Sequence, residues 1–589
     1  MCGIVACYAK EGCYEKLLSA LSRLEYRGYD SAGIALLCGG NFSVRKRAGG
    51  VSNLNGPPLP GDTGIGHTRW ATHGAPTDVN AHPHLCGKFA LVHNGIAENY
   101  AQLKAELAAR GETFVSDTDS EVIVRLIARC YEGDFFAAVV AACARLQGAY
   151  AIAVLCADFP GEVVCARRGS PLVAGYAGGC PYVCSDVPAL GGDAWFCPAE
   201  EGEFIRIRGG SLSFCDASGR EIPKTFVRAD ASPVSGAPRQ GSYMEREIAE
   251  IPSALARTLG GLRRLDFAPC ARAMRGAKHV FAVACGTALH AALAFKDIAE
   301  AEARVPVLCF CSSEFRYRDP PVEAGDLVVA VSQSGETADT LEAVRLARGR
   351  GAYVIAVTNV GHSSLAFAAD YAVVMRAGQE VAVAATKSYN CQLLCLYFLA
   401  AQLCFFRRGV FPAYFGELHG LPEAADAAFS CFPAVSRIAE AFAERPALFF
   451  LGRGAEARTA AEGALKVKEI ARIFSEGLPA GELKHGPLAL VGEGFPVLAL
   501  STSRALLPKM AGAVAEVKAR GARVALFSQY EEAFSQSFAD FSVRLPSVCE
   551  RLMPAVSVIP LQYFACRLCL LRGLDPDRPK NLAKSVTVE

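Results

Sequence analysis

Residues 326–337, with the sequence DLVVAVSQSGET, decide the fold of the second half of the chain. The aliphatic run from 327 to 331 is typical of a strand that is buried on both faces of a sheet. A polar turn follows it, and helical periodicity begins at Ala338. This order of strand, turn and helix predicts a parallel sheet covered by helices, in which ligands bind at the carboxyl ends of the strands.

The same pattern occurs twice in the chain. GAYVIAVTN, from Gly351, resembles GARVALFSQ, from Gly521, and Asp370 in AADYAVVM matches Asp540 in FADFSVRL. Both pairs are 170 residues apart, and a constant offset indicates an internal duplication. Chance similarity between Ala-rich helices is the alternative. We therefore expect two doubly wound parallel-sheet domains in an α/β multidomain chain, at residues 261–415 and 416–579.

The first part of the chain, residues 2–228, has a different pattern. Alternating strand patterns at 89–95, 149–155 and 203–214 are separated by Gly-rich turns, and two helical patterns interrupt them. This mixture predicts an α+β layered domain. A linker is expected at 229–260, because DASPVSGAPRQ at 230–240 is rich in Pro, Ser, Gly and Ala and lacks periodicity.

Composition and charge exclude several classes of protein. A chain of 589 residues is longer than one hydrophobic core usually supports, so we expect several domains. Its composition, with 52% hydrophobic and 20% charged residues, excludes extensive disorder. The 60 Lys and Arg residues nearly balance the 59 Asp and Glu residues, so no global field attracts nucleic acid or an anionic membrane. An anionic ligand must therefore be held by a local site.

The sequence predicts a cytoplasmic protein. MCGIVACYAKEG at the N-terminus lacks the basic region and the longer apolar run of a secretory signal. The most apolar stretches, at 391–406 and around Pro560, are interrupted by polar residues or proline, so we expect buried helices. The 24 cysteines are scattered through strand and helix patterns, so we expect reduced core residues.

Cys2 is a candidate nucleophile. Its small side chain favours removal of the initiator methionine, which would leave the thiol beside a free α-amine that titrates near pKa ~8. A buried structural cysteine is the alternative. Five polar clusters accompany Cys2: RGYDSAG (27–33), HTRWATHG (67–74), NAHPH (80–84), HNGIAEN (93–99) and SDTDSE (116–121).

In their order along the chain and in their residues, these clusters resemble the motifs of the class II glutamine amidotransferase domain of the N-terminal-nucleophile hydrolases. The resemblance implies a four-layer α+β fold and a glutaminase whose nucleophile is Cys2. It places the oxyanion donors at the Asn94 side chain and the Gly95 N–H. It implies an ammonia gate at Trp70, and it assigns glutamine binding to Arg69, Thr72, His73 and Asp119.

Five of the ten histidines lie between His67 and His93, which would fit a metal site. We expect no metal, because the family uses none and no carboxylate-rich ligand set accompanies the histidines. His82 and His84 are expected to orient loops. Arg27 and Asp30 are either turn residues or, as in the family, part of a loop that closes over glutamine.

The turn at 332–337 is a candidate phosphate site. Hydroxyls and backbone N–H groups at the start of a helix bind anions, although a Ser-rich N-cap is the alternative. With the turn Cys285-Gly286-Thr287 and the duplication, it resembles paired sugar isomerase domains, which bind phosphosugars. The resemblance assigns phosphosugar binding to Thr287, Ser332, Gln333, Ser334, Thr337, Val383 and Lys466.

Two positions depart from the family pattern. Ala288 and Ala385 stand where relatives often carry serine, so two hydroxyl contacts to phosphate are missing. The second repeat has Ser501-Thr502-Ser503 at the matching turn without the following Gly-Glu-Thr. We expect one phosphate pocket per chain.

Glu462, Lys466 and Glu469 are spaced i, i+4 and i+7, which places them on one face of a helix. A solvated salt-bridge helix is the usual explanation. Ala and Leu fill many of the neighbouring positions, and GELKHGPLAL follows with His485. The pattern therefore indicates a functional helix.

The C-terminal sequence DRPKNLAKSVTVE, within a tail at 580–589, resembles that of the isomerising glutamine–fructose-6-phosphate aminotransferases, and the resemblance extends from Cys2 to Glu589. It implies that Glu469 moves a proton between C1 and C2, that His485 assists ring opening across a dimer interface, and that Lys584 forms a Schiff base. The implied substrates are L-glutamine and D-fructose 6-phosphate, in a homodimer without cofactor, nucleic acid or membrane partner. A sugar-phosphate-binding regulator, another class II amidotransferase and a stand-alone glutaminase remain alternatives.

Overall fold

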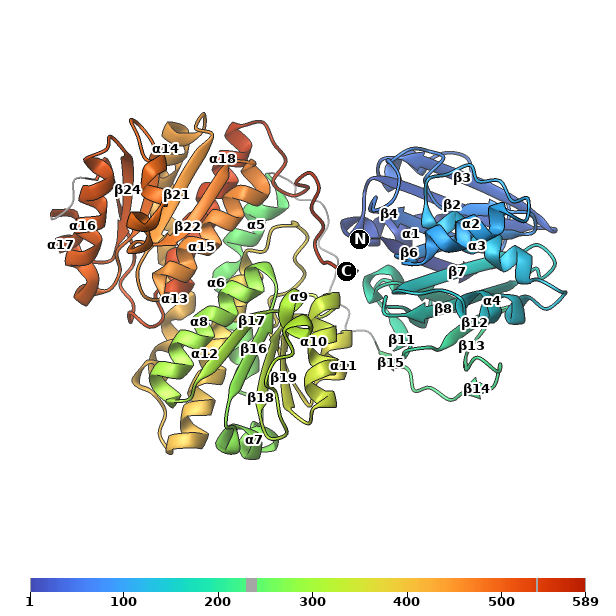
Figure 1. Ribbon diagram of the computed structural model, residues 1–589, viewed down its shortest axis with the longest axis horizontal. Coiled ribbons are helices and arrows are strands. Elements are labelled where there is room, and N and C mark those ends of the chain that lie inside the picture. Colours follow the sequence, from blue (N-terminus) through green and yellow to red (C-terminus); the bar gives the residue numbers. More distant parts are fainter. Residues whose placement is uncertain (1, 229–240, 536–538, 588–589) are drawn as a thin grey trace. The chain divides into compact units, whose positions relative to one another are not determined.

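The computed structural model describes residues 2–228, 241–535 and 539–587. The chain divides into two compact units (Figure 1). The first, termed the N-terminal unit, comprises Met1–Ser235 and Ala583–Glu589, and the second, the duplicated unit, comprises Gly236–Leu582. The stretch 230–240, expected to be an exposed linker, lies outside the described residues.

Two antiparallel sheets form the centre of the N-terminal unit. Among the described residues, the first sheet has the order β15-β11-β9-β10-β1-β4-β2-β3 and the second β14-β13-β12-β8-β7-β6-β5. The first sheet consists of β1 (Gly3–Tyr8), β2 (Ser31–Cys38), β3 (Asn41–Ala48), β4 (Thr63–Arg69), β9 (Val173–Ala177), β10 (Cys180–Cys184), β11 (Ala194–Pro198) and β15 (Val227–Arg228). The second consists of β5 (His84–Cys86), β6 (Phe89–Gly95), β7 (Tyr150–Cys156), β8 (Glu162–Arg168), β12 (Phe204–Arg208), β13 (Ser211–Cys215) and β14 (Glu221–Ile222).

Alternating side chains on these strands build a four-layer structure. On β1, Ile4 and Ala6 face a core between the two sheets, whereas Val5 and Cys7 face α1 (Cys13–Leu24). The outer face of the second sheet packs against α2 (Tyr100–Ala108), α3 (Asp119–Cys130) and α4 (Phe135–Cys143). The predicted four-layer α+β fold is confirmed, since the period of two on each strand supplies both faces of each sheet with apolar residues.

The duplicated unit contains two parallel sheets of the same topology, β17-β16-β18-β19-β20 and β22-β21-β23-β24-β25. The first consists of β16 (Val280–Ala284), β17 (Val307–Cys311), β18 (Leu327–Val331), β19 (Tyr353–Thr358) and β20 (Tyr371–Val374). The second consists of β21 (Ala447–Gly452), β22 (Phe474–Pro479), β23 (Pro496–Leu500), β24 (Arg523–Ser528) and β25 (Phe541–Arg544).

Matching aspartates show that the two repeats are equivalent in detail. Asp370 accepts a hydrogen bond from the Val354 N–H on β19 at 2.8 Å, and Asp540 accepts one from the Val524 N–H on β24 at 2.7 Å. The predicted duplication and its offset are confirmed.

Helices cover both faces of each sheet, as a doubly wound fold requires. In the first repeat, α10 (Ala338–Gly349) and α11 (Ser364–Ala368) cover one face, and α8 (Gly286–Ala303) and α12 (Lys387–Arg408) cover the other (Figure 1). The second repeat has α14 (Phe432–Phe442), α15 (Glu456–Lys466) and α18 (Pro554–Leu571) towards the shared core, and α16 (Leu507–Lys518) and α17 (Glu531–Ser535) outside. Shorter helices are α7 (Ala271–Gly276), α9 (Ser312–Phe315) and α13 (Leu421–Ala427).

One apolar core joins the two repeats through α8, α12, α14 and α18. Helices α12 and α18 are long and apolar enough to cross a membrane, but 83% and 78% of their most apolar windows are buried inside the protein. They are core helices, as predicted.

The segment expected as linker, 229–260, contains helical structure. Helices α5 (Tyr243–Ala249) and α6 (Ile251–Leu262) pack their apolar faces into the core of the duplicated unit. A capping box begins α5: the Glu245 N–H donates to Ser242 Oγ at 3.1 Å, and Glu245 accepts from the Ser242 N–H at 2.9 Å. This Ser-x-x-Glu pattern was the available sequence signal.

Candidate functional site

Cys2 lies at the start of β1, an inner strand paired with β4 and β10. The Trp70 N–H donates to its Sγ at 3.2 Å, and its carbonyl accepts from Arg27 Nε at 3.2 Å and Asn94 Nδ2 at 2.9 Å. Burial raises the pKa of the Cys2 thiol, while the Trp70 hydrogen bond and the charges of Arg69 and Arg27 act in the opposite direction. Three distant segments of the chain therefore hold residue 2 in place.

His67 orients the side chain of Asn94. Burial lowers the pKa of His67 to about 3, so the ring is neutral. Its Nε2 lies 2.9 Å from the His93 carbonyl and 3.0 Å from Asn94 Oδ1. Two acceptors at one nitrogen require the proton on Nε2. Because Asn94 Oδ1 accepts this proton, its amide nitrogen faces Cys2.

Gly95 ends β6, and Asp119 contacts the loop that follows it. Gly95 has φ of +129°, and a Cβ there would lie 2.1 Å from the Ala149 carbonyl oxygen, so only glycine fits. The buried Asp119, at the start of α3, accepts from the Ala97 N–H at 2.9 Å. The structure thus brings Asn94, Gly95 and Asp119 together.

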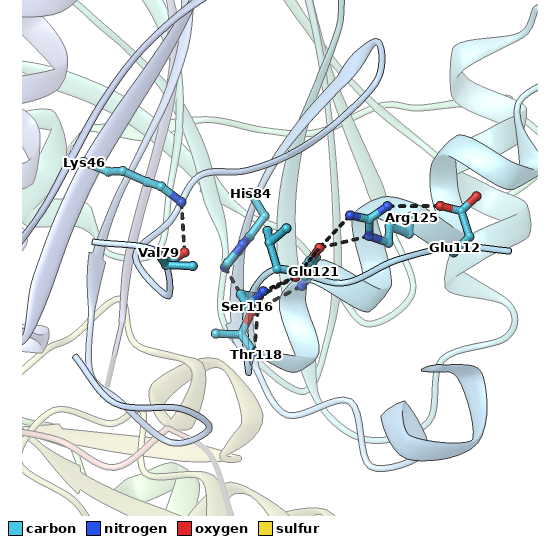
Figure 2. A network of polar contacts seen from close by, with 9 residues as sticks. Lys46, Val79, His84, Glu112, Ser116, Thr118, Glu121 and Arg125 are labelled. Atoms are coloured by element: carbon cyan, nitrogen blue, oxygen red, sulfur yellow. Dashed lines mark hydrogen bonds and ion pairs between the residues drawn. The ribbon is translucent and has the colours of Figure 1, made fainter. Parts of the chain in front are cut away.

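The segment 116–121, which carries Asp119, is fixed by the buried Glu121 (Figure 2). Glu121 accepts from the Ser116 N–H and the Ser116 hydroxyl, both at 2.7 Å, and from Arg125 Nε at 2.9 Å. Arg125 also contacts Glu112 at 3.0 Å. Burial alone would raise the pKa of Glu121. The hydrogen bonds from Ser116 and Arg125 outweigh burial and hold this pKa below its ordinary value.

Arg69, at the end of β4, is buried and shapes the next loop. Its guanidinium donates to the backbone carbonyls of residues 73–75. In this loop Thr72 is exposed, and the His73 ring packs edge-on against Tyr100 with centroids 5.1 Å apart. Asp30 contacts the same region by accepting from the Ala71 N–H at 2.9 Å.

Arg27 is a positioning residue of this site, and its partner Asp186 was not predicted. Arg27 is only 1% exposed and pairs with Asp186 at 2.8 Å, while Asp186 also accepts from Tyr26 at 2.5 Å. Arg27 lies in a turn, Glu25–Arg27, and its side chain also links the Cys2 carbonyl to Asp186. No sequence signal identified Asp186, because it lies 159 residues from Arg27.

Four buried histidines lie side by side near Cys2. The rings of His67 and His82 are 4.0 Å apart and those of His82 and His84 are 4.7 Å apart, with His93 also close. Burial lowers the pKa of each, to about 3 for His84. His84 Nε2 lies 3.1 Å from Thr118 Oγ1, in agreement with its predicted role in orienting a loop. Within the described residues, no group of three or more His, Cys, Asp or Glu side chains is arranged to hold a metal ion.

In the duplicated unit, the turn after β18 forms the expected polar cradle before α10. The buried Ser332 hydroxyl lies 2.9 Å from Thr337 Oγ1 and accepts from the Gly335 N–H at 3.1 Å. Ser334 Oγ accepts from the Glu336 N–H at 3.1 Å. Gly335 has φ of +68°, and a Cβ would lie 2.0 Å from the hydroxyl of Ser363. Gln333 lies in the same turn, so the structure brings the four predicted residues 332, 333, 334 and 337 together.

The matching turn of the second repeat already holds a carboxylate. The buried Glu456, at the start of α15, accepts from Thr502 Oγ1 at 2.7 Å and from Ser557 Oγ at 2.9 Å. Burial raises the pKa of Glu456, against the hydrogen bonds from Thr502 and Ser557. A carboxyl group of the protein itself at this position favours the expected single phosphate site per chain.

Glu462, Lys466 and Glu469 form one cluster with the first repeat. Lys466 Nζ lies 3.4 Å from Glu462 and 2.6 Å from Glu469. It also donates to Thr287 Oγ1 at 2.9 Å, and Thr287 donates to Glu462 at 3.0 Å. Glu462 and Lys466 are 0% and 1% exposed, so the solvated-helix alternative is excluded.

Electrostatics keep Glu462 and Lys466 charged. Although burial opposes the charged forms, Lys466 and His290 hold the pKa of Glu462 below its ordinary value, and the two glutamates raise the pKa of Lys466. After α15 the helix widens into a π-helical turn, Val467–Ala471, that carries Glu469. Such turns often occur at functional sites.

A cavity of about 380 Å³ opens beside Glu469. Besides Glu469, the cavity is lined by Leu465, Lys468, Arg472, Lys580, Asn581 and Leu582. The C-terminal segment therefore reaches the cluster within the duplicated unit.

The architecture agrees with the comparisons with known proteins. A model of the glutamine amidotransferase domain matches residues 67–191, and a model of the SIS domain matches residues 273–402 and 441–572. Over 100% of both chains, the sequence is 45% identical to the glutamine–fructose-6-phosphate aminotransferase (isomerizing) of Symbiobacterium thermophilum and 42% identical to that of Mycolicibacterium smegmatis. The chain belongs to the isomerising glutamine–fructose-6-phosphate aminotransferase family.

A solved structure supports the same assignment for the duplicated unit. The C-terminal domain of glucosamine-fructose-6-phosphate aminotransferase from Francisella tularensis is 34% identical, with a TM-score of 0.56, over 58% of this chain and 99% of that one. The match confirms the family's paired parallel-sheet architecture.

Three further positions expected from the aminotransferase family lie as follows. His485 is exposed at the end of a 3-10 turn, Glu482–His485. The Val383 N–H donates to the Asp577 carbonyl at 3.2 Å, which ties its loop to the C-terminal segment. Lys584 is half-buried and belongs to the N-terminal unit.

The two alanines that depart from the family pattern lie at the starts of α8 and α12. Ala288 is buried in the first turn of α8, and Ala385 is half-buried just before α12.

Proposed function

We propose that the chain converts L-glutamine and D-fructose 6-phosphate to D-glucosamine 6-phosphate and L-glutamate, the first step of amino-sugar synthesis. Two observations in one chain carry the proposal. In the N-terminal unit, the Asn94 amide donates a hydrogen bond to the Cys2 carbonyl. In the duplicated sugar isomerase unit, a buried lysine lies between two glutamates. Relatives that align over their full length bear the name of this activity.

The N-terminal unit would release ammonia from glutamine. After methionine removal, the α-amine of Cys2 takes the thiol proton, and the thiolate attacks the side-chain amide to form a γ-glutamyl thioester. One hydrogen of Asn94 Nδ2 binds the Cys2 carbonyl, and the other, with the Gly95 N–H, would stabilise the oxyanion. Water then hydrolyses the thioester to glutamate.

Glutamine would be recognised at both charged groups of its backbone. Arg69 matches the carboxylate and Asp119 the ammonium group, with Thr72 and His73 in the loop between. Both charged residues are held in place, Arg69 by the carbonyls of 73–75 and Asp119 by the loop after β6. Trp70 would gate the passage of ammonia, which must stay unprotonated to react.

The duplicated unit would hold the sugar phosphate at its cradle. Ser332, Gln333, Ser334 and Thr337 present hydroxyls, an amide and N–H groups at the start of α10, where an anion is favoured. Thr287, Val383 and Lys466 would complete the binding site around the sugar.

The chemistry at the sugar needs an amine and a base. Lys584 would condense with the C2 carbonyl and lose water, and ammonia would then displace it to leave an imine at C2. Glu469 would carry a proton from C1 to C2, which yields the aldehyde and the 2-amino group. Chain connectivity favours Lys584, since it follows the cavity residue Leu582 by two positions, a span of at most ~7 Å between Cα atoms.

The assembly and location complete the proposal. His485 would assist ring opening in the site of a second copy of the chain, and its exposure is compatible with such an interface. The enzyme would be a cytoplasmic homodimer that needs no cofactor. Its glutaminase domain would span 2–228, its sugar isomerase domains 261–415 and 416–579, and its catalytic tail 580–589.

Two single variants test the proposal. Cys2→Ala removes the nucleophile, so glutamate release should fall to background while isomerisation of fructose 6-phosphate persists. Lys584→Ala should lose isomerisation and keep glutamate release. Both activities are measured on full-length protein whose fold is checked by circular dichroism. Loss of both activities in either folded variant would contradict this division of the reaction.

A further inference from the structure

His290, which the sequence left without a role, joins the two repeats at the lysine–carboxylate cluster. It lies on α8 one turn after Thr287, and its Nδ1 is 2.7 Å from Glu462 Oε2 on α15. Its side chain is 19% exposed, whereas Glu462 is fully buried. A histidine of the phosphate-binding repeat is thus hydrogen-bonded to the helix that leads to Glu469.

The contacts of Glu462 and Lys466 divide in a specific way. One oxygen of Glu462 accepts from Thr287 at 3.0 Å, and the other faces His290. With both oxygens partnered, Lys466 lies 0.8 Å closer to Glu469 than to Glu462, at 2.6 Å against 3.4 Å. The ammonium group is therefore directed to the carboxylate of Glu469.

We propose that His290 is a positioning residue for the isomerisation step, because it binds Glu462 and so keeps Lys466 directed at Glu469. The inference rests on the proposed function, in which Glu469 moves the proton between C1 and C2. A buried carboxylate that loses a partner draws the nearest cation to itself. Without His290, Lys466 would move towards Glu462 and away from Glu469.

The charges around the cluster give this movement a consequence. Glu469 is faced by Lys466 from α15, by Lys468 and Arg472 from its own segment, and by Lys580 across the cavity. Loss of the closest of these cations removes the strongest electrostatic partner of the Glu469 carboxyl group.

On the other side of the cluster, Glu462 is faced by His290 from α8, by Lys466, and by Tyr389 from α12. Burial raises the pKa of Tyr389 well above its ordinary value, so it stays neutral. Of the residues that the structure describes, Lys466 is the one ion-pair partner that Glu462 would keep in a His290 variant.

The test compares three variants of His290 with a histidine control in the full-length protein. His290→Ala and the bulkier His290→Phe remove the donor, and His290→Gln retains one. His279→Ala is the control, because His279 also pairs with a buried carboxylate, Asp326 at 3.2 Å, but precedes β16 at the edge opposite the cradle. The readouts are kcat, KM and the pH profile for fructose 6-phosphate isomerisation, with glutamate release as a check on the other half-reaction.

We expect His290→Ala and His290→Phe to lower kcat by about 10-fold to 100-fold, with KM within about twofold. The acidic limb of the kcat profile should move to higher pH, because the base has then lost its closest cation. His290→Gln should restore most of kcat and the position of the limb, and His279→Ala should match the wild type.

An unchanged kcat and acidic limb in His290→Ala would overturn the inference. A raised KM with unchanged kcat would overturn it too, since His290 would then contact the ligand. If the alanine variant fails to fold, the same criteria apply to His290→Phe, which keeps the volume of the ring. A wild-type chain without isomerisation would overturn the proposed function, and this inference with it, whereas an active wild type with unaffected variants overturns the inference alone.

Discussion

His67, Arg27 and Glu121 illustrate how single residues build the N-terminal site without being nucleophiles. His67 decides which atom of Asn94 faces Cys2, and Arg27 links the Cys2 carbonyl to Asp186. Glu121 holds the segment that presents Asp119. Each is buried and hydrogen-bonded, so its loss leaves an unpaired partner inside the protein.

Glu121→Gln tests this at one residue. The amide keeps the size of the side chain but replaces one acceptor oxygen by an NH2 donor, which faces the donors of either Ser116 or Arg125. The free energy of unfolding of the N-terminal unit should therefore fall by about 2 kcal/mol. Urea denaturation followed by tryptophan fluorescence measures it, because both tryptophans, Trp70 and Trp195, lie in this unit.

Glu112→Gln is the matched control, since Glu112 is the more exposed partner of the same Arg125. We expect it to change the free energy of unfolding by less than about 1 kcal/mol. Equal effects of the two substitutions would show that burial of Glu121 is not what stabilises the segment.

At the scale of elements, the strands β4, β5 and β6, with the loop that precedes β5, bring four neutral histidines into one buried cluster. The pKa of His67 and His84 is about 3 in the folded protein, against ~6.5 in an unfolded chain. Below pH ~6.5 the unfolded chain therefore binds more protons than the folded one. Stability is fully present above this pH and is lost as pH falls towards 3.

This predicts acid sensitivity of the N-terminal unit. Between pH ~6 and ~4, each such histidine should lower the free energy of unfolding by about 1.4 kcal/mol per pH unit. His84→Gln should reduce this slope by about that amount, in urea denaturation at several pH values monitored by tryptophan fluorescence. A slope that is the same in the variant and the wild type would show that protonation of His84 does not cause the acid sensitivity.

Elements with strong periodicity could be predicted from the sequence. Strand β6 has the predicted bounds, the two repeats have the predicted offset, and Glu462, Lys466 and Glu469 share the predicted face. Helices α5 and α6 were not predicted. The linker expected from the composition of 230–240 was extended to residue 260, although a capping box and an amphipathic pattern lie within that range.

Contacts between distant segments could not be predicted in the same way. Asp186 reaches Arg27, and His290 reaches Glu462, across 159 and 172 residues. Both pairs depend on how whole strands and helices pack, and neither partner has a distinctive local pattern. Cys2, the serine-rich turn at 332–337 and the C-terminal tail carry local motifs, so a resemblance to a family was enough to single them out as candidate site residues.

At the scale of the whole molecule, the proposed function gives the chain two separate kinds of active site. The N-terminal unit carries the Cys2 site, and the duplicated unit uses one core shared by two repeats to hold a serine cradle and a lysine–carboxylate cluster. Since Thr287 contacts both Glu462 and Lys466, the two repeats act as one site rather than as two copies of it. Residues 580–582 line the cavity of the duplicated unit, and Ala583–Glu589 belong to the N-terminal unit.

Trapping of the Schiff base is the decisive experiment for the proposed reaction. The full-length protein is incubated with fructose 6-phosphate, reduced with sodium borohydride, digested and analysed by mass spectrometry. We predict a reduced hexose phosphate adduct on Lys584, which is absent in Lys584→Ala and retained in Lys580→Ala. An adduct on Lys466, Lys580 or any other lysine, or none at all, would refute the role of Lys584.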